Sequence, residues 1–196
     1  MATFAELVAD VKTITNRPDL DTEIKLAVKV ATLKAHHSDY YPKDLYESGI
    51  EWATPRYVQS FEYRTLIPRW RAFKYLRKYD SDDSEAGAFF TLIIPETVLD
   101  RYGVEKENVC YLAGEILEIK SSTLDEHMLL GCYRHPDITE STYSSFIALD
   151  HPHLIMLEAS SKIFKMIGQE EAAAALKTDI AEQYMILKQE ISAEGF

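Results

Sequence analysis

The sequence lacks the features that mark several common protein classes. No apolar run approaches the roughly 18 residues of a membrane-spanning helix, and Glu6 and Asp10 stand where a signal peptide would have its apolar region. Two cysteines, Cys110 and Cys132, are too few for a disulfide framework or a four-thiolate zinc site. We therefore expect a soluble protein whose cysteines are reduced core residues.

Glycine is scarce and dispersed. The closest two of the seven glycines are Gly103 and Gly114, so none cluster. Phosphate-binding loops, dinucleotide-binding fingerprints and the GxSxG nucleophile elbow need clustered glycines, because the backbone must approach a ligand closely or adopt positive φ. The sequence excludes all three motifs.

Positive charge is in the minority. The chain has 21 Lys and Arg against 32 Asp and Glu, which gives a formal net charge of −11. A protein that binds duplex DNA over a broad face needs the opposite balance. With 196 residues, 46% of them apolar, the chain is otherwise long and apolar enough to bury a sizeable core.

The N-terminal end has helical periodicity. Residues 3–6 read Thr-Phe-Ala-Glu, a capping box that opens a first helix, and an acidic cap at Asp19 or Asp21 opens a second one that ends near His37. The second helix has apolar residues on two sides, which predicts packing on both. Its second apolar side consists of Leu26, Val30 and Leu33.

The C-terminal end is also helical by pattern. The sequence Asp-His-Pro at residues 150–152 starts a helix that Gly168 ends, and a last helix with a single apolar stripe follows. The stripe consists of Leu176, Ile180, Tyr184, Leu187 and Ile191.

Between the two ends the pattern becomes typical of strands. Aromatic and β-branched residues are frequent in residues 57–66, 69–79 and 88–94. Residues 109–119 are predicted to form a hairpin that turns at Ala113-Gly114, and residues 128–133 a further strand.

The predicted fold class is therefore α+β. A helical bundle formed by both chain ends, residues 1–50 and 150–196, is expected to carry an inserted β-rich domain with an antiparallel sheet, residues 51–149.

No pattern of chemistry-bearing residues predicts an enzyme. The pair His36-His37 occupies neighbouring helix positions, which do not share a face, and Pro152 makes the pair His151 and His153 a helix start. The acidic run at residues 80–85 is typical of a solvated loop. We predict no catalytic residue, no cofactor-binding residue and no metal ligand.

Residues 64–78 are unusually basic and contain no acidic side chain. Aromatic residues alternate with the cations, which is one way to bind single-stranded nucleic acid. The alternatives are an edge strand whose cations prevent aggregation and pair with acidic groups of the same protein or an adjacent subunit, or contact with a different partner protein. The cations are Arg64, Arg69, Arg71, Lys74, Arg77 and Lys78, and the aromatic residues are Trp70, Phe73 and Tyr75.

Most of the chain resembles the head-to-tail adaptor proteins of short-tailed bacteriophages, also called tubular tail protein A-like or gatekeeper proteins. The resemblance rests on fold-determining residues rather than on a catalytic motif. Its carriers are residues 68–75 (PRWRAFKY), Pro95 with residues 99–103 (LDRYG), residues 111–115 (YLAGE), residues 144–147 (SSFI) and residues 167–170 (IGQE).

The resemblance implies a helical bundle from both termini around a β-rich insertion. It also implies a structural virion protein without enzyme activity or cofactor, which forms a ring, commonly of twelve copies, between the portal protein and the tail nozzle protein. Viral DNA would pass through this ring without sequence-specific contact, and no membrane is involved. The implied location is the virion neck, with host cytoplasm during assembly.

On this interpretation, two sets of residues are candidate protein interfaces, one in the basic segment and one in the last helix. They are Arg69, Arg71, Lys74, Arg77 and Lys78, and Tyr184, Leu187 and Ile191. The isolated chain is expected to be largely monomeric and to form a ring only on the portal, with the last helix docking. The alternative function is a nucleic-acid-binding accessory protein that uses residues 64–78.

Overall fold

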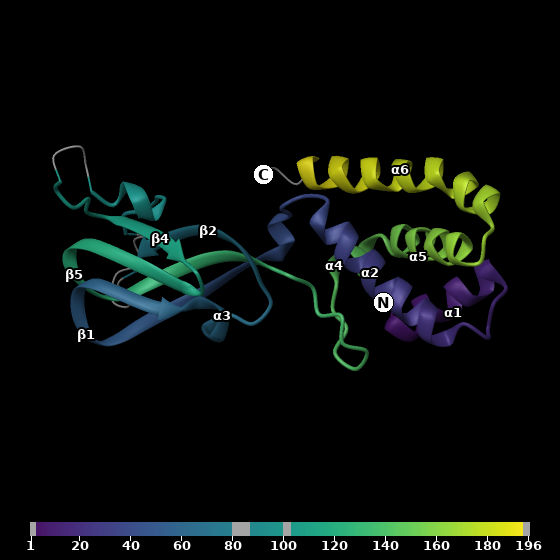
Figure 1. Cartoon of the computed structure of the whole chain (residues 1–196), viewed down its shortest axis with the longest axis horizontal. Coiled ribbons are helices and arrows are strands. Elements are labelled where there is room, and N and C mark those ends of the chain that lie inside the picture. Colours follow the sequence, from purple (N-terminus) through teal and green to yellow (C-terminus); the bar gives the residue numbers. More distant parts are fainter. Residues whose placement is uncertain (1–2, 80–86, 100–102, 194–196) are drawn as a thin grey trace. The chain divides into compact units, whose positions relative to one another are not determined.

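The computed structural model describes residues 3–79, 87–99 and 103–193 (Figure 1). Helices and a sheet are both present, which confirms the predicted α+β class. The chain forms two compact units: a helical unit of Met1–Asp44 with His135–Phe196, and a β unit of Leu45–Arg134.

The boundaries of these units differ from those expected after residues 50 and 149. The β unit begins earlier because Leu45 already pairs with the last strand of the sheet. It also ends earlier, since residues 135–145 belong to the helical unit. There the ring of Tyr143 packs on that of Phe4, with 5.3 Å between centroids.

The helical unit contains α1 (Phe4–Thr15), α2 (Asp21–His37), α4 (Phe146–Asp150), α5 (Pro152–Met166) and α6 (Glu170–Ala193), with the 3-10 turn η1 (Pro42–Asp44). Two of the expected helix starts are confirmed, whereas the acidic cap expected at Asp19 or Asp21 is wrong, because Leu20 is the N-cap of α2 and its side chain makes no capping hydrogen bond. Thr3 and Glu6 form the capping box of α1, and Pro152 lies in the first turn of α5. Gly168 follows α5 with a φ of 77°, a conformation that favours glycine.

The core of the helical unit draws on both ends of the chain. Its fully buried side chains come from α1, α2, α4, α5 and α6, so none of these helices buries its apolar face alone. Among them are Leu7, Val11, Ile24, Val28, Ile147, Leu154, Ile155 and Leu187. The expectation that α2 packs on two sides is wrong for Leu26, which is 62% exposed.

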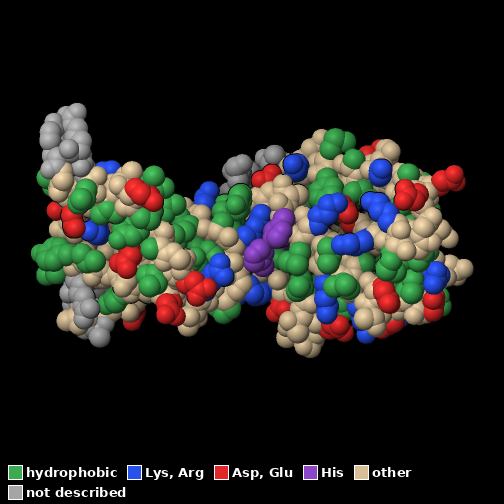
Figure 2. Space-filling model, in the orientation of Figure 1, with side chains coloured by type: hydrophobic (Ala, Val, Ile, Leu, Met, Phe, Trp, Pro, Cys, Tyr) green, Lys and Arg blue, Asp and Glu red, His purple; other side chains and the backbone are tan. Residues whose placement is uncertain are grey.

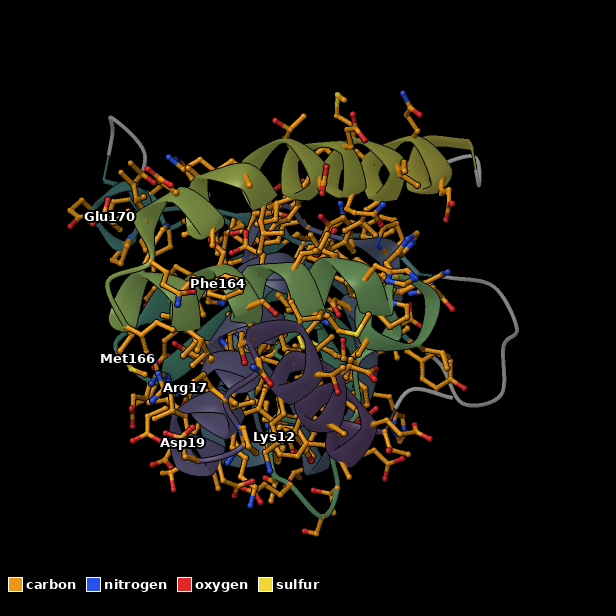
Figure 3. All side chains as sticks on the ribbon, turned by 90° about the vertical axis from the view of Figure 1, so that its right-hand side faces the viewer. Lys12, Arg17, Asp19, Phe164, Met166 and Glu170 are labelled. Carbon is orange, nitrogen blue, oxygen red and sulfur yellow. The ribbon has the colours of Figure 1, made fainter. Side chains whose placement is uncertain are left out.

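Two turns lie side by side at one end of the helical unit (Figure 3). Arg17 and Asp19 come from the α1–α2 turn, and Met166 and Glu170 from the α5–α6 turn. Arg17 donates to both carboxylate oxygens of Asp19, at 2.9 and 2.7 Å, and these hydrogen bonds lower the pKa of Asp19 to about 2.

The β unit is a five-stranded sheet arranged around one long strand. Its elements are β1 (Leu45–Glu62), the helical turn α3 (Tyr63–Leu66), β2 (Trp70–Lys78), β3 (Thr91–Leu92), the 3-10 turn η2 (Pro95–Thr97), β4 (Val109–Ala113) and β5 (Ile116–Arg134). β1 pairs antiparallel with one side of β5. On the other side β4 pairs with the first part of β5 and β2 with the last part, while β3 pairs with β4 in parallel.

Two predicted strands differ from the structure. β1 starts at Leu45 and ends at Glu62, and residues 63–66 form a helical turn instead of continuing the strand. The two strands expected at residues 115–119 and 128–133 are one strand, because no glycine or proline interrupts residues 116–130.

Gly131 in β5 makes room for the ring of Tyr75 in β2. A Cβ at residue 131 would lie 2.5 Å from Cε1 of Tyr75, whereas one at Gly49 would meet nothing within 4 Å. The ring also contacts Phe89, with 5.7 Å between centroids, so it has neighbours that resist its displacement.

We expect Gly131→Ala to destabilise the β unit by about 1–3 kcal/mol, the cost of overpacking. Gly49→Ala is the matched control and should be neutral or slightly stabilising, because alanine restricts the unfolded chain. Both tryptophans, Trp52 and Trp70, lie in the β unit, so tryptophan fluorescence during urea unfolding reports on this unit. Equal midpoints for the two variants would contradict the close contact with Tyr75.

Candidate functional site

The basic segment follows α3 and β2. Arg64 lies in α3, Arg69 in the turn before β2 with a φ of 64°, and the other four cations on β2 itself. The end of β2 pairs with residues 87–90 on its outer side, where Phe90 donates to the carbonyl of Leu76 at 2.8 Å. Within the described residues, this outer pairing does not extend to the beginning of β2, which is therefore a sheet edge.

Two register shifts in β2 send its aromatic residues to opposite faces of the sheet. Trp70 and Phe73 pack against the core of the β unit, and Tyr75 lies on the other face against Gly131. Binding of single strands needs a row of exposed ring faces on which bases stack. The structure does not present the three rings of this segment as such a row.

The β unit engages several of its own cations. Lys78 donates to Ser121 at 3.0 Å, and the ammonium group of Lys74 lies 5.8 Å from the ring centroid of Tyr133. The guanidinium group of Arg77 lies 5.9 Å from the ring centroid of Tyr75. Arg69 and Lys74 are exposed and Arg71 is half-buried, so Arg69 and Lys74 are the best placed for contact with another molecule.

The apolar stripe of α6 is a core face, which corrects its expected role as an interface. Leu187 is fully buried, and Ile180 and Tyr184 pack against the same core. Burial raises the pKa of the Tyr184 phenol, an effect that nearby Glu158 reinforces, so the hydroxyl stays protonated. The side chain of Ile191 lies outside the described residues.

Exposed apolar side chains are found on both units, such as Leu26 and Met185 on the helical unit, and several in the β unit lie in β3 and in the segment after it. Figure 2 shows hydrophobic side chains on the surface of this unit. Leu92 and Ile94 are two residues apart in extended backbone and so point to the same side, and further along the chain the backbones of Leu99 and Glu105 pair with each other. We name Leu92, Ile94, Leu99 and Val104, which are 47–62% exposed, the β3-edge patch.

Sequence reasoning missed this patch. The run Leu92-Ile93-Ile94 before Pro95 predicts a strand but does not show that the strand forms an open edge.

A second constellation that sequence reasoning missed lies in the helical unit. Nδ1 of His36 is 2.8 Å from both carboxylate oxygens of Asp44, and Nε2 is 2.8 Å from Oγ of Ser145. His36 is buried, as a structural histidine would be, yet both ring nitrogens are engaged by side chains that are distant in sequence.

The cysteines are free and buried, as predicted. Burial raises the pKa of Cys110 to about 12 and that of Cys132 to about 11, so neither forms a thiolate nucleophile at neutral pH. In the described ranges, no group of three His, Cys, Asp or Glu side chains is arranged to hold a metal ion. No helix there is long and apolar enough to cross a membrane.

Comparison with known proteins finds no family model and no curated sequence that matches the chain.

We expect Leu187→Ala to lower the free energy of unfolding of the helical unit by about 2–5 kcal/mol, because it leaves a cavity in the core. Met185 lies on the same helix and is 57% exposed, so Met185→Ala should lower the free energy of unfolding by less than about 1 kcal/mol. Far-UV circular dichroism at 222 nm during urea unfolding measures both. Similar small losses would show that α6 is not packed on the core.

Proposed function

We propose that this chain is a head-to-tail adaptor, a structural protein of a short-tailed virus particle. On this proposal it forms a ring, dodecameric as the resemblance implies, between the portal and tail nozzle proteins, and lines the channel through which DNA is ejected. It assembles in host cytoplasm and ends in the virion neck. The resemblance implies a helical bundle from both termini around a β-rich insertion. The division of the chain into a helical unit and a β unit supports this proposal.

The β3-edge patch is the observation that carries the proposal. Ile94 and Val104 are each 62% exposed, and β3 is a two-residue strand at the end of the sheet. Exposed apolar groups beside an unpaired strand edge favour association, because another chain can cover the side chains and pair with the backbone. If the edge of one copy contacts a different surface of the next copy, the contact is heterologous and can close into a ring.

The charge of the chain suits a DNA channel. At −11 per copy, a ring of many copies repels the phosphates of a passing duplex, so the DNA is not retained.

The alternative function, a nucleic-acid-binding accessory protein, rests on Arg69 and Lys74. Both are exposed near the open edge of β2, and they give it a local positive charge. The cations further along β2 contact side chains of their own unit, which leaves a small patch for phosphates.

We expect the isolated chain to be largely monomeric and to form a multi-copy complex with the portal protein of the same virus. Ile94→Glu should abolish the multi-copy complex, because it places a charge in the contact between copies. Leu26→Glu is the matched control: Leu26 is also 62% exposed, but it lies on α2. Native mass spectrometry of each protein with and without portal measures the copy number. Equal assembly by wild type and Ile94→Glu would contradict the role of the β3-edge patch.

The double variant Arg69→Glu with Lys74→Glu separates the two functions. We expect reduced assembly with the portal, because the cations face acidic groups of a neighbouring protein. Wild-type chain should not retard labelled single-stranded DNA in a salt-dependent manner. The opposite result would be that the wild type retards the DNA at low salt, while the double variant no longer does so but still assembles with the portal. In that case the nucleic-acid function is correct instead.

A further inference from the structure

Hydrogen bonds link three side chains of the helical unit into one network. Asp44 in η1 contacts Nδ1 of His36 in α2, and Nε2 of His36 contacts the hydroxyl of Ser145, which precedes α4; both nitrogens are 2.8 Å from their oxygen partners. The three residues come from segments far apart in sequence, so only the folded helical unit assembles them.

The partners of His36 fix its tautomer. A carboxylate only accepts hydrogen bonds, so Nδ1 must carry the proton that is donated to Asp44. In the neutral ring this leaves a lone pair on Nε2, directed at Oγ of Ser145. The backbone N–H of Ala148 donates to the same oxygen at 3.0 Å, so the hydroxyl proton of Ser145 is free to point at Nε2. This is the arrangement in which histidine acts as a base toward serine.

The histidine and the aspartate are shielded from water, whereas the serine lies at the edge of a cleft. The side chains of His36 and Asp44 are 1% and 6% exposed, and the ring of Phe146 lies 5.0 Å from that of His36. Ser145, in contrast, is half-buried and lines a cleft of about 360 Å³. Capping α4 requires only the contact between Ser145 and Ala148, and does not account for the histidine and the carboxylate behind it.

The cleft indicates the class of substrate. Its apolar side is formed by Tyr143 and the exposed Leu149, and its polar lining comprises Thr3, Glu140, Ser141, Ser144 and Ser145. The buried ring of Phe4 supports that of Tyr143, with 5.3 Å between centroids, so Tyr143 and Leu149 provide the apolar surface for a short aliphatic or aromatic acyl group.

We propose that Ser145 and His36 are the nucleophile and the base of a serine-hydrolase site that cleaves esters with a small apolar acyl group, with Asp44 as the positioning residue. The activity is independent of the adaptor function, and the resemblance does not imply it. It adds a chemical step to a structural protein.

Water is the only co-reactant that the hydrolysis of the ester needs. Oγ of Ser145 forms a bond to the ester carbonyl carbon while its proton moves to Nε2 of His36. The bond from that carbon to the alkoxy oxygen breaks, and the departing oxygen takes the proton from Nε2. Water then attacks the acyl-serine, again giving one proton to Nε2. The bond from the acyl carbon to Oγ breaks, and the proton returns to Ser145, which releases the carboxylic acid.

The test uses the full-length chain and a fluorophosphonate probe, which reacts covalently with activated serines. Intact mass and peptide mapping report the labelled residue, and hydrolysis of p-nitrophenyl butyrate reports turnover. We expect one label per chain at Ser145, and none on the chain unfolded in urea, where the three side chains are apart.

Matched variants distinguish catalysis from capping. Ser145→Ala and Ser145→Asn should both lose label and turnover, although asparagine is itself a favourable capping residue. Ser60→Ala, at an exposed serine on β1 of the β unit, is the control and should behave as wild type. Asp44→Asn should lower turnover by about 10⁴-fold by favouring the wrong histidine tautomer. Circular dichroism confirms that each variant is folded.

Absence of labelling on the folded wild-type chain would overturn the proposal, and so would label or turnover that persists in Ser145→Ala.

Discussion

The fold depends on one feature of the chain path. After forming the β unit, the chain returns to the place where it left the helical unit. Leu45 at the start of β1 pairs with Tyr133 near the end of β5, so the β unit delivers residue 135 close to residue 44. Hydrogen bonds then join the two halves of the helical unit, among them Thr32 to Tyr143 at 2.6 Å and His36 to Ser145 at 2.8 Å. The antiparallel pairing of β1 and β5 thus returns the chain to the helical unit, where both contacts form.

The two units present different surfaces. In the helical unit, Lys and Arg side chains gather over α2 and α5 (Figure 2), and Lys29 pairs with Glu140 at 3.0 Å. The apolar stripe of α6 is turned inward, whereas Leu26 on α2 is exposed. The β unit engages several of its own cations and leaves the β3-edge patch exposed. This division favours assembly through the β unit, and it leaves the Ser145 cleft within the helical unit.

Local signals predicted the helices well and the tertiary contacts poorly. The capping box at Thr3 and the terminal Gly168 depend on neighbouring residues, so the sequence alone contains them. The early start of β1 and the unbroken length of β5 depend on pairing between distant segments. The stripe through Leu187 was misread because a core-facing helix and a docking helix share the same periodicity. The contacts of His36 were missed because no spacing rule relates residues 36, 44 and 145.

The central claim is that the chain occupies the neck of a virus particle as a ring, and the most direct measurement is a cryo-electron microscopy map of the intact particle. The account predicts a ring of density between portal and nozzle into which copies of the helical unit and the β unit fit, with the β3-edge patch covered by a neighbouring copy. A neck without such density, in particles whose protein content by mass spectrometry lacks this chain, would contradict it.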